Sequence, residues 1–238
     1  MLKELAQYIV DLRKPNMQEI DGRTYTDKSL TVVKNQIVEP LRTSTLDSIL
    51  DYIAHNVDGI KDEKKVIHIE SYDTVKLYKN LDSFNHRECY LVADALLPTV
   101  TLDRFLPLEN FNIQLQSTFV PSENTETVLR VCGNIIDNDV KEYGDDGVSQ
   151  QVTAKKGIAM VENVKVPNRT NLRPYRTFAE VEQPESSFVL RLKKDQREDQ
   201  MVAGLFEADG GAWKLQAIKN IKEYLQKCVK EQNVVIMA

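Results

Sequence analysis

Apolar residues near the two ends of the chain recur at three- and four-residue steps, the spacing that places side chains on one side of a helix. In the first such segment they are Leu2, Leu5, Ile9 and Leu12. That segment stops before Pro15, which cannot continue a helix. A second helix is expected over residues 46–57, with Thr45 placed to cap it and Gly59 to end it.

The clearest helix is expected over residues 212–230. Asp209 is placed to cap it, and Gly210 and Gly211 suit a tight turn from a preceding strand. The apolar side of this helix consists of Trp213, Leu215, Ile218, Ile221, Leu225, Cys228 and Val229. Lysines cover much of the remaining surface, so the pattern predicts a helix packed along one side of the molecule.

From about residue 64 to 207 the apolar pattern changes to alternation, which is typical of strands. A further strand is expected earlier, at residues 29–33. The segments expected as strands in the central region are 66–69, 74–78, 89–93, 111–119, 127–131, 148–153, 158–164, 188–192 and 201–207. Many short strands separated by loops favour antiparallel pairing.

These elements predict an α+β fold, with mainly antiparallel central sheets of short strands, helices in the N-terminal region and a long C-terminal helix. We expect an N-terminal helical region, residues 1–62, packed on a main body. The body, residues 63–238, should be rich in strands and should contain helix 212–230. The two parts are expected to form one cooperative unit.

Composition limits the function classes that fit the chain. It has 238 residues and a formal net charge of −5, which counts against a protein that clamps long duplex DNA. No apolar run approaches the roughly 20 residues that cross a bilayer, and the N-terminus lacks the pattern of a secretory signal. We therefore expect a cytoplasmic protein with no membrane association. Its three cysteines, Cys89, Cys132 and Cys228, should be reduced.

The segment from Val166 to Phe178 is the strongest candidate for a binding site, because it combines arginines and rings with two stiffening prolines. Guanidinium groups pair with phosphate in bidentate fashion, and aromatic rings stack on bases. The candidate ligand-binding residues are Arg169, Asn171, Arg173, Tyr175 and Arg176, with Lys155 and Lys156 nearby. The alternative is that the arginines pair with Glu180, Glu182 and Glu185 and only hold the loop in place.

Other motifs carry a weaker chemical signal. Tyr143-Gly-Asp-Asp146 resembles the metal-binding turn of RNA-dependent polymerases, but residues 145–147 also fit an ordinary hairpin turn. An enzyme using Asp145, Asp146, Glu207 and Asp209 would need these carboxylates to converge on a divalent cation. His55, His68 and His86 show no metal-ligand spacing, and no cysteine lies in a nucleophile motif. We expect no catalytic residues, metal or cofactor.

Four segments resemble the YfdQ-like family of uncharacterised tailed-phage and prophage proteins. They are Ser44–Tyr52, Tyr143–Gln150, Arg173–Pro184 and Leu205–Trp213, which follow in order along most of the chain. The resemblance implies a phage or prophage origin and action in the host cytoplasm, outside the virion. It transfers no catalytic residues.

Two functions follow as hypotheses. The first is a non-catalytic, self-assembling binding protein, a homo-oligomer that sequesters a small anionic nucleotide-type signal or a host defence protein, as phage counter-defence proteins do. The second is an accessory of phage recombination or replication that holds single-stranded nucleic acid through the same arginines, lysines and Tyr175. Binding of the second kind should weaken steeply with salt.

Overall fold

The computed structural model describes residues 2–11, 14–29, 37–60, 62–82, 85–133, 143–145, 150–156, 160–166, 169–196, 198, 200–230 and 232–238. Contacts divide the chain into two units, Met1–Ile37 and Val38–Ala238. The first unit contains α1 (Leu2–Asp11) and a hairpin of β1 (Met17–Ile20) and β2 (Arg23–Thr26). The hairpin turns at Asp21 and Gly22, both with positive φ, as a two-residue turn between antiparallel strands requires. Neither α1 nor the hairpin buries a residue.

The second unit contains two hydrophobic cores. The first core is built on a five-stranded sheet in the order β14-β4-β5-β6-β3. Its strands are β3 (Leu41–Thr43), β4 (Lys65–Ile69), β5 (Thr74–Lys79), β6 (Cys89–Asp94) and β14 (Val234–Met237). The central three strands pair antiparallel, while β3 and β14 join in parallel at the edges.

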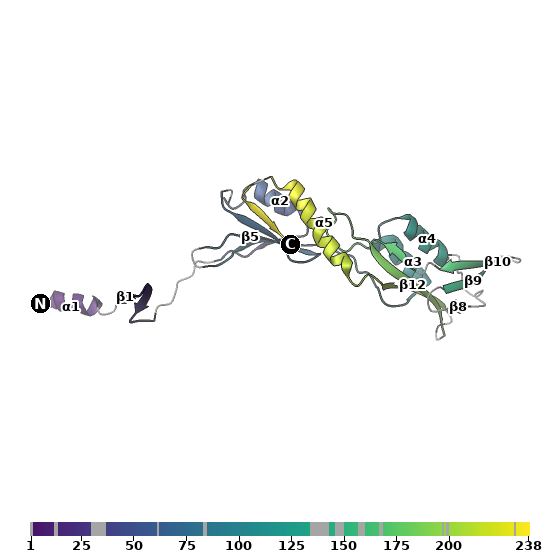
Figure 1. The fold of residues 1–238 in the computed structure, drawn as a ribbon, viewed down its shortest axis with the longest axis horizontal. Coiled ribbons are helices and arrows are strands. Elements are labelled where there is room, and N and C mark those ends of the chain that lie inside the picture. Colours follow the sequence, from purple (N-terminus) through teal and green to yellow (C-terminus); the bar gives the residue numbers. More distant parts are fainter. Residues whose placement is uncertain are drawn as a thin grey trace. The chain divides into compact units, whose positions relative to one another are not determined.

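Two helices cover one face of this sheet, α2 (Asp47–Ala54) and α5 (Ala212–Cys228), as Figure 1 shows. Ile49 and Ile53 of α2 and Ile221 and Leu225 of α5 pack with the alternate residues of the strands that point toward them. Leu77 of β5 is fully buried among them. The apolar face of each helix and the apolar face of the sheet therefore pack together in one core, as the spacing of apolar residues predicts.

The second core is built on a four-stranded antiparallel sheet in the order β11-β12-β13-β7. Its elements are β7 (Leu106–Pro107), α3 (Leu108–Thr118), α4 (Glu123–Gly133), β11 (Thr170–Leu172), β12 (Ser186–Asp195) and β13 (Gln200–Glu207). Phe111 and Leu115 of α3 and Val128 of α4 pack against Leu190 of β12 and Leu205 of β13. The chain crosses between the two cores in the segment 173–185, which we call the crossover.

A third sheet pairs β8 (Tyr143–Asp145), β9 (Gln150–Lys156) and β10 (Met160–Val166) antiparallel in the order β10-β9-β8. Asp145 pairs with Gln150 across β8 and β9. Asp146, and with it most of the expected turn at 145–147, lies outside the described residues.

The α+β class with mainly antiparallel sheets and a long C-terminal helix is confirmed. The expected strands near β4, β5, β6, β9, β10, β12 and β13 are confirmed, as are the helices at 2–12, 46–57 and 212–230 within a few residues at their ends. The expected strand at 29–33 falls largely outside the described residues. The division of the chain at residue 62 stays a prediction, and α2, which precedes it, contributes to the first core.

Two expected strands are wrong, because residues 111–119 and 127–131 lie in α3 and α4. Phe111, Ile113 and Leu115 alternate as a strand would, but Phe111 and Leu115 are also one helical turn apart. Phe111 and Leu115 are buried and Ile113 is 56% exposed, which is the pattern of a helix. In the C-terminal helix Leu215 was expected to be buried but is 73% exposed, since the buried side of α5 follows Trp213, Ala217, Ile221 and Leu225.

Candidate functional site

The candidate binding segment has two faces. Along residues 169–176 the even-numbered side chains are buried, while the odd-numbered ones are exposed or partly exposed. This alternation follows from the extended conformation of β11 and of the residues after it, whose even positions are buried, with Leu172 in the second core. The odd-numbered side chains, which we call the exposed strip, are Arg169, Asn171, Arg173 and Tyr175.

Arg173 is the one arginine of the segment that pairs with a predicted glutamate. Its Nη1 donates to Glu182 Oε1 at 2.8 Å, and both side chains are substantially exposed. Glu180 instead accepts the backbone N–H of Leu46 at 2.7 Å, before α2. Arg169 forms no ion pair with any described residue. Self-pairing of the loop is therefore limited to one exposed contact, which leaves Arg173 able to exchange partners.

Arg176 is buried and lies between the two cores. Its Nη1 donates to Glu207 Oε1 at 2.6 Å, and its guanidinium carbon lies 4.3 Å from the ring centre of Trp213 and 5.2 Å from that of Phe188. Burial lowers the pKa of Arg176, and the charge of Glu207 opposes that shift. The residue therefore joins the start of α5 to the second sheet, which sequence spacing alone did not indicate.

Gln183 holds the crossover in shape. Its side-chain oxygen accepts the backbone N–H groups of Arg176 at 2.8 Å and Thr177 at 3.2 Å, and its Nε2 donates to the carbonyl of Phe178 at 3.0 Å. The crossover has no regular secondary structure here, so its buried backbone groups need such partners. A buried glutamine five residues after Phe178 carried no signal in the sequence.

The turn into α5 places Asp209 beside Arg176. Gly210 and Gly211 have φ of 64° and 81°, a left-handed conformation that glycine adopts without strain. Asp209 Oδ1 accepts the N–H of Gly211 at 2.9 Å, so the tight turn is as predicted, although the N-cap position itself is Gly211. Burial opposes the charge of Asp209, but Ser186, the Gly211 amide and Arg176 outweigh it, and the pKa of Asp209 lies below its usual value.

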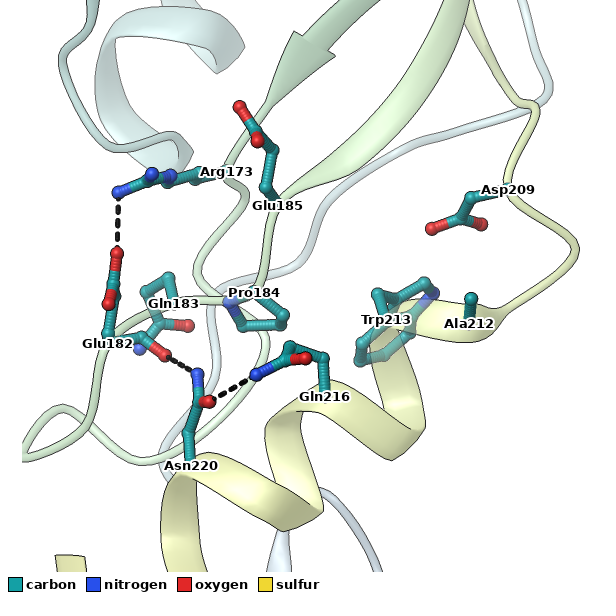
Figure 2. Close-up of a pocket in the computed structure, with 10 residues that line it drawn as sticks. All are labelled: Arg173, Glu182, Gln183, Pro184, Glu185, Asp209, Ala212, Trp213, Gln216 and Asn220. Atoms are coloured by element: carbon teal, nitrogen blue, oxygen red, sulfur yellow. Dashed lines mark hydrogen bonds and ion pairs between the residues drawn. The ribbon is translucent and has the colours of Figure 1, made fainter. Parts of the chain in front are cut away.

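A pocket of about 440 Å³ opens between the crossover and the first turns of α5. Figure 2 shows Arg173 and Glu182 on one side of it and Asp209 and Trp213 on the other. It is lined by Arg173, Glu182, Gln183, Pro184, Glu185, Asp209, Ala212, Trp213, Gln216 and Asn220. We call it the crossover pocket. Its size falls within the range of small-molecule sites in proteins.

One rim of the crossover pocket is held by a chain of hydrogen bonds. Gln216 Nε2 donates to Asn220 Oδ1 at 2.7 Å, and Asn220 Nδ2 donates to the carbonyl of Glu182 at 2.8 Å (Figure 2). Glu182 in turn pairs with Arg173. The network orders α5 against the crossover before any ligand arrives, which lowers the entropy cost of binding.

Several polar atoms in and behind the pocket are buried without a hydrogen-bond partner among the described residues. They are Arg176 Nε and Nη2, Ser186 Oγ, Asp209 Oδ2 and Trp213 Nε1. The Ser186 hydroxyl is close enough to Asp209 to favour the charged carboxylate, yet the pair does not meet hydrogen-bond geometry. Buried polar groups are normally satisfied, so this cluster suits water or the polar groups of a ligand.

The charged residues that line the pocket are mainly acidic. Glu182, Glu185 and Asp209 line it against the one lining guanidinium of Arg173. Carboxylates accept hydrogen bonds from hydroxyl and amino groups but repel phosphate. An anionic group is therefore disfavoured beside Asp209. At the Arg173 side, which continues into the exposed strip, it competes with Glu182 for the guanidinium.

The remaining candidate residues do not assemble with this pocket as far as the structure describes them. Lys155 and Lys156 lie in β9, where they pair with Val161 and Met160 of β10. Asp146 lies outside the described residues, and Glu207 is occupied by Arg176. Where the structure is described, no three histidine, cysteine, aspartate or glutamate residues cluster as a metal site would require.

In the described part of the chain, no helix combines the length and apolarity needed to span a bilayer. The resemblance to YfdQ-like phage proteins stays a prediction. No protein-family model, curated protein or solved structure matches the chain.

Proposed function

We propose that this protein binds a nucleotide-type ligand in the crossover pocket without transforming it. The observation that carries the proposal is the set of buried, unpartnered polar atoms around Asp209 and Trp213, beside a pocket large enough for a mononucleotide. Unsatisfied buried donors and acceptors are costly, and a ligand with both kinds of group relieves that cost.

The arrangement favours one orientation of such a ligand. Hydroxyl groups of a sugar both donate and accept, so they match Asp209 Oδ2 and Trp213 Nε1 once these buried atoms turn toward the pocket on binding. Phosphate is repelled by Asp209 and Glu185 and is drawn to Arg173, which can exchange Glu182 for it. The nucleoside end therefore enters the pocket, and the phosphate stays at the rim near the exposed strip.

The biological setting is part of the proposal and rests on the resemblance described above. A phage or prophage protein that acts in the host cytoplasm and holds a nucleotide signal would counteract a host defence by sequestration. Sequestration needs affinity and abundance but no catalytic group. Self-assembly would raise the number of sites in each particle.

Calorimetry with adenosine, AMP, cyclic nucleotides and ADP-ribose tests this function. We expect heat with at least one phosphorylated compound and weaker binding after Arg173→Ala, by about tenfold for one lost charge-assisted contact. Arg130→Ala is the matched control, because Arg130 is an exposed arginine of α4 that does not line the pocket. Absence of heat with every compound at about 100 μM protein would exclude binding tighter than about −5 to −6 kcal/mol and would end the proposal.

A second candidate function is supported by the exposed strip. Alternate residues of an extended chain lie about 6.6 Å apart on one face, so two guanidinium groups, an amide and a ring follow one another in a row. Such a row suits a single-stranded nucleic acid, whose phosphates meet arginine and whose bases stack on tyrosine.

A fluorescent single-stranded oligonucleotide separates the two candidates. Binding of the oligonucleotide to the exposed strip should be lost as the salt concentration rises, and it should weaken after Arg169→Ala or Tyr175→Ala. Neither residue lines the crossover pocket, so both variants should leave binding of a mononucleotide unchanged. An oligonucleotide that stays free in low salt would exclude this function.

A further inference from the structure

β14 exposes the backbone at one edge of the five-stranded sheet. The N–H of Lys65 donates to the carbonyl of Asn233 at 2.9 Å, so Asn233 faces β4. Backbone groups of successive strand residues point to alternate sides, so those of Val235 and Met237 also face β4. Those of Val234 and Ile236 point away from it. Among the described strands, none pairs with this outer side.

Edge strands are usually protected against pairing with another chain by a charge, a proline, a bulge or a covering segment. The other described edge strands in the unit Val38–Ala238 each contain a proline, a charged residue or another polar residue. These residues are Arg42 in β3 after Pro40, Pro107 in β7, Asp145 in β8, Glu162 and Lys165 in β10, and Asn171 in β11. The carbonyl of Asn171 also accepts a hydrogen bond from Asn124 at 3.0 Å. β14, with the sequence Val-Val-Ile-Met, carries no such residue.

The side chains of β14 are also apolar on both faces. Val234 and Ile236 pack against the first core, whereas Val235 and Met237 are 56% and 50% exposed on the opposite face. Their neighbours across β4 are Val66 and His68. No charged side chain of β14 would be buried if a second strand joined here.

We infer that β14 pairs antiparallel with β14 of a second copy of this chain, about a two-fold axis at Val235. In this register Val234 of each copy exchanges both backbone hydrogen bonds with Ile236 of the other, and the two Val235 side chains face each other. Two five-stranded sheets then continue as one. β3 cannot do the same at its own centre, because two Arg42 guanidinium groups would be opposed. The assembly does not depend on a ligand in the crossover pocket.

Light scattering during size exclusion tests the pairing at several protein concentrations. The native chain should shift with concentration from 27.2 kDa toward twice that mass. Val235→Lys places two ammonium groups opposite each other at the axis and should raise the dissociation constant at least tenfold. Leu41→Lys is the matched control, since Leu41 is 55% exposed on the opposite edge strand and should leave the mass unchanged.

Disulfide trapping fixes the register. In the proposed pairing, Val235→Cys places two cysteines directly opposite at a separation that a disulfide spans, so oxidation should give a covalent dimer. Met237→Cys lies opposite Asn233 of the other copy and should not cross-link, and the native chain with its three cysteines is the baseline. A native chain that stays at 27.2 kDa at all concentrations overturns the inference. So does a dimer that Val235→Lys leaves intact or that Val235→Cys does not trap.

Discussion

Each of the two hydrophobic cores of the unit Val38–Ala238 consists of a sheet with two helices packed against it. They differ in how well their helices and strands can be predicted from the sequence pattern. In the first core, β4 alternates strictly, β5 alternates along most of its length, and α5 repeats its apolar residues every three or four positions. In the second core, the apolar residues of α3 fit both the two-residue spacing of a strand and the three- to four-residue spacing of a helix. A short apolar run therefore forms a helix or a strand according to which of its residues find buried partners, and not according to its period alone.

The cores also differ in what surrounds them. The first core receives strands from distant parts of the chain, since β3 and β14 flank β4, β5 and β6. The second is built mainly from residues between 106 and 207. Arg176 and the crossover connect them, and the crossover pocket lies at this connection. Pockets between packed parts of a protein are common ligand sites.

The largest expected effect comes from breaking the connection. Arg176→Ala removes a buried charge that contacts both Trp213 and Phe188 and leaves Glu207 without its partner, so we expect the free energy of unfolding to fall by about 3 kcal/mol. Urea denaturation measures it. Amide hydrogen exchange should quicken in both α5 and β12, because Arg176 contacts Trp213 of the first and Phe188 of the second.

Arg173→Ala is the control for that variant, because it removes the same side chain from the same segment at an exposed ion pair. It should change the free energy of unfolding by less than about 1 kcal/mol. Equal effects of the two substitutions would contradict the view that burial makes Arg176 the stabilising arginine of the crossover.

A smaller effect should come from overfilling the second core. A Cβ at Gly204 of β13 would lie 2.7 Å from the carbonyl oxygen of Arg104, a backbone atom that cannot rotate away. Gly204→Ala should therefore lower the free energy of unfolding by about 1–3 kcal/mol in denaturant titration.

Gly133→Ala serves as its counterpart at an exposed position, since nothing lies within 4 Å of a Cβ there and the residue ends α4. It should be neutral or stabilising by up to about 1 kcal/mol. Equal destabilisation by both substitutions would contradict close approach as the cause at Gly204, since a Cβ at Gly133 meets no atom within 4 Å.

The smallest effect concerns pH at the start of α5. The pKa of Asp209 is lower in the folded chain than in the unfolded chain, where it is about 3.9. The charge of Asp209 therefore stabilises the fold above the unfolded pKa. This stabilisation is lost as the pH falls through the folded pKa. Asp209→Asn should cost under about 1 kcal/mol at pH 7. The difference from the native chain should shrink below about pH 4, as thermal melts at several pH values would show.

Glu185→Gln is the matched control for the pH experiment, because Glu185 lines the same pocket and is exposed. Its melts should differ little from those of the native chain at every pH. A difference between Asp209→Asn and the native chain that grows on acidification would contradict the assignment.

The candidate site was only partly predictable from the sequence. Arg173 and the turn at Gly210–Gly211 were identified, because arginine beside aromatic residues and a Gly pair before a helix have local signatures. The roles of Gln183 and Glu207 were missed, because their partners are set by the path of the crossover. One available signal for α4 was overlooked: Ser122 follows a proline, and its hydroxyl accepts the N–H of Thr125 at 3.2 Å, as a helix cap does.

The α+β class, the long C-terminal helix and most strands could be predicted from local patterns, because they depend on the spacing of apolar residues within one element. That Arg176 is buried while Arg173 is exposed depends on the three-dimensional fold, although the two are three residues apart. The partner of Arg176 lies 31 residues away, and Trp213, over which it packs, belongs to α5. Burial and charge pairing depend on where distant segments meet, and local spacing does not carry that information.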